Sequence, residues 1–279
     1  MEVTDFLESE EALRANFILT RAQRKQQRRL ERKCNKNKKA ENNTQKRVMT
    51  LKKISPLTEA QADVFQSFEE GQNLLLHGVA GTGKTFLVSY LALREILENQ
   101  TYSHFKIIRS IVPGRDIGFL PGTAKEKAKV FETPYISNVN DLFGRGDAYE
   151  VLCQKNVIQF ETTSFLRGET FKDTIVLVDE FQNCNYQELS TIITRCGKNT
   201  RIVFAGDYSQ TDLQWMKERQ GSLDFMNILH EMNSFDTIEF GVDDIVRSGL
   251  VKEFLIEKLK FEKNVRDERI PTERDYKVF

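Results

Sequence analysis

The clearest candidate for chemistry in this chain is the stretch HGVAGTGKTF at residues 77–86. A glycine, four residues, a second glycine, then lysine and threonine is the spacing of a phosphate-binding loop, whose consecutive backbone N–H groups surround the phosphates of a nucleotide. In such a loop Lys84 would reach the terminal phosphate oxygens and Thr85 would coordinate Mg²⁺. Glycines suit the turn because no side chain blocks the phosphate and because they adopt positive φ at little cost.

The residues on either side of the loop have the pattern that such a loop requires. Residues 73–77 are a short apolar run typical of a buried strand, and residues 84–97 are densely apolar at helical spacing. A helix beginning at Lys84 would direct the positive end of its dipole at an anion. A flexible glycine turn is the alternative, but these four fixed positions should arise by chance with a probability of roughly one per cent. We expect ATP to bind at Gly78, Val79, Ala80, Gly81, Thr82, Gly83, Lys84, Thr85 and Phe86.

Two adjacent carboxylates follow a second apolar run. Residues 174–178 (TIVLV) lead directly into Asp179 and Glu180. In a phosphate-loop enzyme the first carboxylate holds magnesium and the second can orient or deprotonate the attacking water. A DE pair alone is a common surface dipeptide. The buried strand before it and the loop in the same chain favour the functional interpretation.

A third apolar run, residues 201–205, ends in the polar sequence GDYSQTD at residues 206–212. A glutamine amide just past a strand end can donate to the γ-phosphate and accept from the attacking water, so Gln210 is a candidate sensor of ATP cleavage. An Asx-type turn closed by Asp207 is the alternative. The spacing alone does not decide between the two.

The elements that must position these residues alternate along the chain. Helical stretches separate most of the apolar runs, which predicts right-handed βαβ crossovers and a mostly parallel sheet flanked by helices on both faces. Ligands of such sheets bind beyond the carboxyl ends of the strands, where the candidate residues fall. The apolar runs are residues 73–77, 105–108, 157–160, 174–178, 201–205 and 237–240. The expected fold is an α/β P-loop NTPase.

The net charge of the 279 residues is zero, but the charge is unevenly distributed. Residues 21–53 hold 14 Lys and Arg against 2 acidic residues, so this basic arm carries about +12. Few large apolar side chains interrupt it, which predicts disorder or a solvated helix. Such an arm could bind nucleic acid by releasing counterions from phosphates, or could be a solubilising extension or dock on an acidic body. We expect an N-terminal extension over 1–55, in which residues 1–20 could form one amphipathic helix before the basic arm, and a globular domain over 56–279.

Composition also bounds the class of protein. No apolar run approaches the length needed to cross a bilayer, and the acidic start lacks the order of a signal peptide. We therefore expect a cytoplasmic protein without a membrane partner. The four cysteines form no CxxC pair and the three histidines do not cluster with them, so neither structural zinc nor disulfides are expected.

The chain contains five motifs in a fixed order, namely HGVAGTGKT, GFLPG at 118–122, SFLRGETFKDTIVLVDEFQN at 164–183, AGDYSQTDL at 205–213 and DDIVRSGLV at 243–251. Together they resemble the motifs of the phosphate-starvation-inducible PhoH family, in the stand-alone form found in many bacteriophages. The resemblance covers roughly residues 56–260 and leaves out residues 1–55. It implies a RecA-like ATPase core related to superfamily-one helicases, activity on RNA or single strands, and a ring-shaped, hexameric assembly.

The same resemblance implies roles for two further residues. Gln61 resembles the glutamine that reads adenine in superfamily-one enzymes, although Thr58 and Gln61 also fit a capping box in which the glutamine caps its own helix. Arg247 resembles the family arginine that touches the γ-phosphate, the alternative being one exposed arginine among many. Other candidates near strand ends could meet nucleic acid or phosphates or stack bases, with a core or interface role favoured for the aromatic ones. These candidates are Arg109, Arg115, Arg167, Phe119, Phe165 and Trp215.

The length of the globular part predicts an oligomer. Helicases that move as monomers place ATP between two RecA-like lobes, whereas residues 56–279 suffice for one lobe with insertions. Another copy of the chain is the simplest source of a second wall, which would place ATP at a subunit interface and deliver an arginine in trans.

The sequence thus predicts a homo-oligomeric, Mg²⁺-dependent ATPase that binds, moves along or unwinds single-stranded RNA or DNA, with RNA favoured. Lys84, Glu180, Gln210 and Arg247 would be catalytic, Thr85 and Asp179 would hold the metal, and Gln61 would join the loop in binding ATP. A protein-remodelling or scaffold ATPase is the alternative. A small-molecule kinase lacks a recognisable acceptor site, and ribonuclease activity would have to reuse the same acidic pair.

Overall fold

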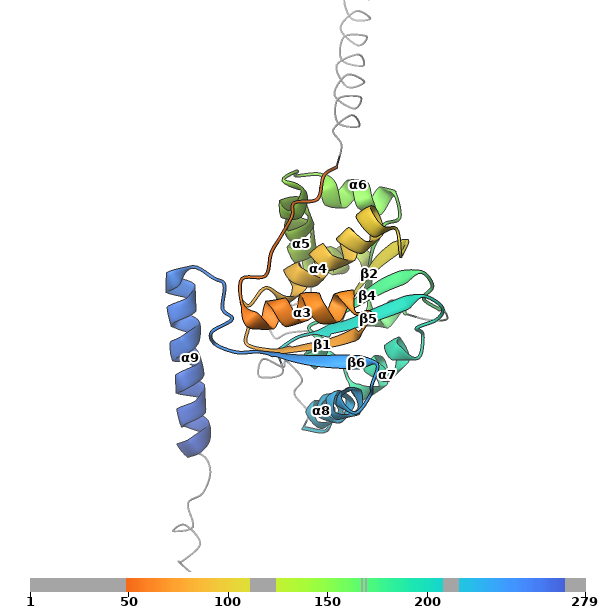
Figure 1. The fold of residues 1–279 in the computed structure, drawn as a ribbon. Helices are drawn as coiled ribbons and strands as arrows, with labels where there is room; N and C mark the ends of the chain where they lie inside the picture. Colours follow the sequence, from red (N-terminus) through yellow and green to blue (C-terminus); the bar gives the residue numbers. More distant parts are fainter. Residues whose placement is uncertain (1–48, 111–123, 167, 169, 208–215, 269–279) are drawn as a thin grey trace, which may run out of the picture. The chain divides into compact units, whose positions relative to one another are not determined.

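The computed structural model describes residues 49–110, 124–166, 168, 170–207 and 216–268 (Figure 1). The chain divides into two units, Met1–Thr50 and Leu51–Phe279. Most of the predicted basic arm lies outside the described residues. The helices and strands described all belong to the second unit.

A six-stranded sheet forms the centre of this unit, with the strand order β3-β2-β4-β5-β1-β6. Every pairing between neighbouring strands is parallel. The prediction of a mostly parallel, RecA-like α/β fold is confirmed. The strands are β1 (Asn73–Gly78), β2 (His104–Arg109), β3 (Ile158–Thr162), β4 (Thr174–Asp179), β5 (Thr200–Ala205) and β6 (Phe235–Phe240).

Helices cover both faces of the sheet. Figure 1 shows α3 to α6 on one face, α7 and α8 on the other, and α9 after the last strand. The helix predicted over 84–97 is α4, which a π-helical turn at Glu95–Asn99 prolongs. The helices are α3 (Glu59–Glu69), α4 (Lys84–Arg94), α5 (Ala124–Phe143), α6 (Ala148–Gln154), α7 (Tyr186–Ile193), α8 (Met216–His230) and α9 (Gly249–Glu268).

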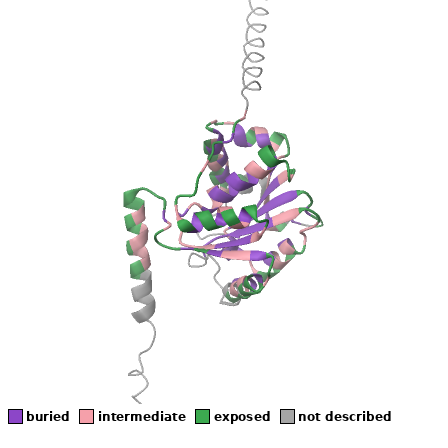
Figure 2. Cartoon of the chain, viewed as in Figure 1, coloured by how far each residue is buried: buried purple, intermediate pink, exposed green. Residues whose placement is uncertain are grey.

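The burial of each strand follows from its place in the sheet. All six residues of β4, a central strand, are buried, because helices cover both of its faces (Figure 2). The edge strands β3 and β6 are only partly buried. An aromatic group fills one layer of the core: the Phe204 ring lies 5.1 Å from that of Phe225, 6.2 Å from Phe235 and 6.3 Å from Phe181, measured between centroids.

The strand register brings the candidate residues to one edge of the sheet. Ala205, the last residue of β5, pairs with Leu76 of β1 on one side and with Asp179 of β4 on the other. The backbone that leaves these three neighbouring strands therefore emerges at one place. This is why a loop, an acidic pair and a glycine that are far apart in the sequence can form a single site.

Truncating a buried leucine of β1 should destabilise the fold strongly. Leu76 is fully buried, so Leu76→Ala removes apolar contacts and leaves a cavity, and we expect it to lower the free energy of unfolding by about 2–5 kcal/mol. The matched control is Leu57→Ala, whose side chain is 75% exposed and whose loss should change stability by less than about 0.5 kcal/mol. Urea denaturation followed by circular dichroism measures both, and equal effects would contradict the described packing.

Candidate nucleotide-binding site

The predicted phosphate loop joins the end of β1 to the start of α4, as its sequence context requires. Gly78, Gly81 and Gly83 adopt φ of 112°, 80° and 84°, the left-handed region that glycine enters at little cost. Gly78 is constrained a second time, since an added Cβ would lie 2.2 Å from the carbonyl oxygen of Phe240 on the neighbouring strand. The loop is thus fixed by its own backbone and by β6, independently of any ligand.

Lys84 folds back into the hollow of the loop. Its Nζ donates to the carbonyl oxygens of Gly78 at 2.9 Å and Val79 at 2.8 Å, and to Thr82 Oγ1 at 3.3 Å. Only 8% of the residue is exposed, and this burial lowers the pKa of the ammonium, an effect that the negative charge of Asp207 partly opposes. The loop therefore holds a buried positive charge at the point where α4 begins.

The hydroxyl of Thr85 and the carboxylate of Asp179 meet at the centre of the site. Thr85 Oγ1 donates to Asp179 Oδ1 at 2.9 Å, and the phenol of Tyr135 on α5 donates to Asp179 Oδ2 at 2.7 Å. Burial, followed by the charge of Glu180, raises the pKa of Asp179 to about 6. Burial and the charge of Asp179 raise the pKa of Tyr135 well above its usual value, so the phenol stays protonated and donates. A carboxylate and a hydroxyl are the hard oxygen ligands that Mg²⁺ takes, so this pair fits a magnesium site.

Glu180 is held in an uncommon backbone conformation directly after β4. Its φ and ψ are 51° and 42°, and a short 3₁₀ turn at Phe181–Asn183 follows. Gln182 Nε2 donates to Glu180 Oε2 at 2.5 Å, while Gln182 Oε1 accepts from the backbone N–H of Asp207 at 3.1 Å. The buried amide of Gln182 thereby connects the ends of β4 and β5, and it fixes one oxygen of the candidate base.

Gly206 leaves room for this connection. A Cβ at Gly206 would lie 2.1 Å from Gln182 Oε1, closer than any two such atoms can approach. The predicted sensor, Gln210, lies outside the described residues, as does the remainder of the predicted turn after Asp207. The role of Gln210 stays a prediction.

Gln61 ties the start of α3 to the phosphate loop. Its Nε2 donates to the carbonyl oxygen of Thr82 at 3.0 Å, and its Oε1 accepts from the backbone N–H of Leu57 at 2.9 Å. Thr58 caps the helix by accepting from the backbone N–H of Gln61 at 3.4 Å. One half of the predicted capping box is present, but the glutamine side chain bonds one residue before the N-cap. The adenine-reading role of Gln61 stays a prediction.

Arg247 lies beside the phosphate loop of its own chain. The neighbouring Val246 N–H donates to the carbonyl oxygen of Gly81 at 3.2 Å. A Cβ at Gly81 would lie 3.0 Å from Arg247 Cγ and 3.2 Å from Leu255 Cδ1 of α9. The arginine predicted from the resemblance is therefore placed at the loop by the segment that follows β6.

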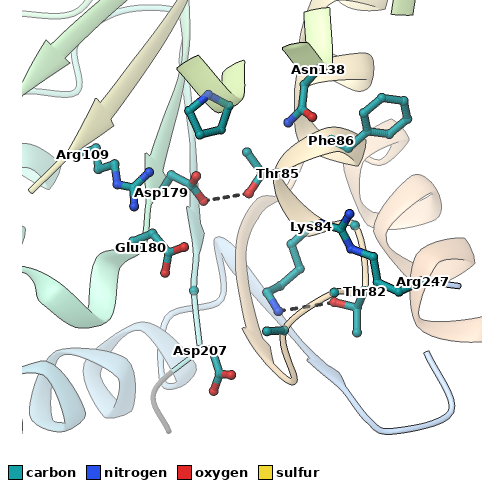
Figure 3. Close-up of a pocket in the computed structure, with 15 residues that line it drawn as sticks. Thr82, Lys84, Thr85, Phe86, Arg109, Asn138, Asp179, Glu180, Asp207 and Arg247 are labelled. Atoms are coloured by element: carbon teal, nitrogen blue, oxygen red, sulfur yellow. Dashed lines mark hydrogen bonds between the residues drawn. The ribbon is translucent and has the colours of Figure 1, made fainter. Parts of the chain in front are cut away.

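These residues line one cavity of about 400 Å³, shown in Figure 3. It brings together most of the predicted site, while Gln61, Gly78 and Val79 support the loop from outside the lining. Arg109, at the end of β2, also enters it, with its guanidinium 5.5 Å from the centre of the Phe131 ring. The lining residues are Ala80, Gly81, Thr82, Gly83, Lys84, Thr85, Phe86, Arg109, Pro134, Asn138, Asp179, Glu180, Gly206, Asp207 and Arg247.

Sequence reasoning missed two residues that hold the acidic pair. No sequence pattern around Tyr135 indicated a role, because this residue lies on a helix outside all five motifs. Gln182 had a weak signal, because it stands three residues after the strand end in the SFLRGETFKDTIVLVDEFQN motif. Other candidates lie outside the described residues, namely Arg115, Phe119, Arg167, Trp215 and the side chain of Phe165.

Comparisons with known proteins identify the family that the chain resembles. A sequence model of the family described as PhoH-like protein matches residues 53–257. Protein PhoH2 of Bacillus subtilis (strain 168) is 34% identical over 155 residues, covering 54% of this chain and 35% of that protein. The PhoH-like protein of the same strain is 28% identical over 204 residues, covering 73% of this chain and 63% of that protein. The chain thus matches between about a third and just under two thirds of the length of these relatives.

Solved structures with a similar chain path include helicases. The crystal structure of DUF1998 helicase MrfA bound to DNA and AMPPNP has a TM-score of 0.42 and 13% identity, covering 66% of this chain and 27% of that chain. The Pif1 helicase from Candida albicans has a TM-score of 0.33 and 14% identity, covering 67% and 40%. Likenesses of this size do not indicate what the chain binds. Separately, no helix among the described residues is long and apolar enough to cross a membrane.

Asp179→Asn should change how stability depends on pH when metal is removed by a chelator. The pKa of Asp179 is raised from 3.8 to about 6, so the folded state binds this proton more tightly than the unfolded chain. The stability that the protonated group supplies is lost as the pH rises from about 4 through 6, by an amount on the order of 3 kcal/mol. Asparagine carries no charge, so near pH 7 we expect Asp179→Asn to be the more stable protein.

Urea denaturation with EDTA at several pH values checks this expectation. The stability advantage of Asp179→Asn over wild type should shrink towards pH 4. The control is Asp63→Asn on the exposed surface of α3, which should follow wild type at every pH. An advantage that is constant between pH 4 and pH 7 would show that the charge of Asp179 is not the cause.

Proposed function

The chain belongs to the PhoH-like protein family, a family of P-loop NTPases, and from this we propose that it is a Mg²⁺-dependent ATPase acting on single-stranded nucleic acid. The observation that carries the ATPase proposal is the shared cavity. The phosphate loop, the Thr85–Asp179 pair and Glu180 all reach it, from the ends of two strands, β1 and β4. This is the set of groups that phosphoryl transfer to water requires.

Each group has a separate task in the proposed reaction. The loop N–H groups and Lys84 would neutralise the phosphates, with Lys84 exchanging its bonds to loop oxygens for bonds to phosphate oxygens. Thr85 and Asp179 would hold Mg²⁺, which when bound neutralises charge and orients the phosphates. Glu180, fixed by Gln182 through one oxygen, would use its carboxylate to orient and deprotonate the attacking water. Gln210 would sense the γ-phosphate, and Gln61 would contact adenine.

Arg247 would act on the nucleotide bound to its own chain. Its side chain lies against Gly81 and lines the same cavity as Lys84, which supports action in cis. A positive charge near the γ-phosphate stabilises the charge that develops in the transition state. Another copy of the chain would then supply a second wall to the cavity without supplying this arginine.

The proposal that the ATPase acts on nucleic acid rests on the positive charge of the basic arm and on the family resemblance. Residues 21–53 carry about +12 and would bind phosphates without needing a fold. We infer coupling of ATP hydrolysis to movement along or unwinding of single strands, with RNA favoured, in a homo-oligomeric, hexameric ring. A protein-remodelling ATPase would hydrolyse ATP in the same cavity but would not bind a nucleic-acid strand.

Glu180→Gln should abolish ATP turnover while leaving ATP binding intact. The amide keeps the shape of the side chain but cannot accept the proton of water, so we expect turnover to fall by about 10²–10⁴-fold. Turnover is measured at several protein concentrations, with and without single-stranded RNA or DNA. The control, Glu231→Gln, changes an exposed glutamate directly after α8 and should behave as wild type.

The same assay distinguishes a nucleic-acid motor from a protein-remodelling ATPase. Wild-type turnover that rises with oligomer formation and with one added strand would support the nucleic-acid motor. Turnover indifferent to every strand would favour the protein-remodelling ATPase. Full turnover by Glu180→Gln would contradict the proposed role of this carboxylate.

Mixing two inactive variants tests whether Arg247 acts in cis. We expect Arg247→Ala to lower turnover by about 10³-fold or more, and Lys84→Ala to remove ATP binding. In a mixed oligomer, an Arg247→Ala subunit, which keeps Lys84, can lie beside a Lys84→Ala subunit, which keeps Arg247. Because Arg247 contacts its own loop, we expect the mixture to stay inactive. Recovery of turnover on mixing would show that the arginine acts in trans.

A further inference from the structure

A buried tyrosine completes the surroundings of the central carboxylate. Tyr135 is fully buried, and its phenol donates to Asp179 Oδ2 at 2.7 Å, on the carboxylate oxygen that Thr85 does not contact. It comes from α5, which contributes no residue to the phosphate loop or to the acidic pair. Asp179 therefore receives one hydroxyl donor from α4 and another from α5.

Two donors at opposite oxygens fix the plane of a carboxylate. Rotation of the Asp179 side chain about its terminal bond would break the bond from Thr85 Oγ1, the bond from Tyr135, or both. The tyrosine itself has little freedom, since its ring packs 5.6 Å from that of Phe160 on β3, measured between centroids. The orientation of the carboxylate is thus set by the packing of α5 on the sheet.

The turn of α5 around Tyr135 faces the nucleotide cavity. Pro134 and Asn138, one residue before and three residues after the tyrosine, both line it. Phe131, one turn earlier, lies under the guanidinium of Arg109, which also lines the cavity. The part of α5 around Tyr135 therefore borders the same cavity that Asp179 lines.

We propose that Tyr135 is a positioning residue for the metal–nucleotide complex, which aims Asp179 Oδ1 and Thr85 Oγ1 at the bound divalent cation. The inference rests on the proposed function, because it assumes that this cavity binds ATP with Mg²⁺. Without the phenol, Asp179 Oδ2 would be buried without its donor, and the carboxylate would turn away from the geometry that suits the cation. Nucleotide held by the loop N–H groups and Lys84 alone does not need this geometry.

The chain contains a matched control for the change. Tyr149 on α6 is only 4% exposed, and its phenol donates to the carboxylate of Glu132 at 2.7 Å, the distance found between Tyr135 and Asp179. Neither Tyr149 nor Glu132 lines the cavity. Tyr149→Phe therefore removes the same kind of bond between a buried phenol and a carboxylate, at a place where no metal or nucleotide is expected.

The experiment measures binding of a fluorescent ATP analogue to the full chain, once with Mg²⁺ and once with EDTA. We expect Tyr135→Phe to weaken binding about 5–30-fold with Mg²⁺, the loss that corresponds to one buried hydrogen bond, and by less than about twofold with EDTA. Tyr149→Phe should match wild type in both conditions. Circular dichroism confirms that each variant is folded, which the retained phenyl ring favours.

A second measurement isolates the partner of the phenol. In an Asp179→Asn background, Tyr135→Phe should cause no further Mg²⁺-dependent loss, because the carboxylate it positions is already gone. Equal weakening with Mg²⁺ and EDTA, or a similar loss in Tyr149→Phe, would overturn the inference and leave Tyr135 a purely structural residue. The inference would also be overturned if Mg²⁺ strengthened nucleotide binding by wild type and Tyr135→Phe bound as tightly as wild type. If wild type bound no nucleotide with either Mg²⁺ or EDTA, the proposed function would be overturned as well.

Discussion

A carboxylate buried at the carboxyl edge of a parallel sheet is the constraint around which this site is arranged. Asp179 is only 6% exposed, and burial of its charge is costly unless donors and positive charges surround it. The protein supplies Thr85 from α4 and Tyr135 from α5, while Arg109 and Lys84 lie close enough to affect the same group of charges. The helix that follows the phosphate loop, the tyrosine and the acidic pair are therefore parts of one electrostatic unit.

Local patterns were sufficient to predict the sheet and the main groups of the site. Buried parallel strands appear in the sequence as short apolar runs, and polar residues that follow those runs must gather at one edge. The loop at 77–86 and the pair Asp179–Glu180 could be placed in this way. The length of the chain predicted that another copy delivers an arginine in trans, without identifying that arginine. In the structure the side chain of Arg247 lies at its own loop, through the path taken after β6.

The rest depends on contacts between distant parts of the chain. Tyr135 and Asp179 are separated by 44 residues, and no spacing rule links a tyrosine inside a helix to a carboxylate after a strand. Gln61 shows a different difficulty, because the sequence offered a capping role and an adenine-binding role. In the structure its side chain bonds to two backbone groups, Thr82 O and Leu57 N–H, and no sequence pattern indicates these two bonds.

The contact between Gln182 and Gly206 has a consequence for how this site can vary. The glutamine amide occupies the space in which any side chain at position 206 would begin, so a single substitution at that glycine displaces the bridge to Glu180. A larger residue at 206 becomes acceptable only together with a shorter one at 182. As related proteins diverge, residues 182 and 206 should therefore change together or both stay the same.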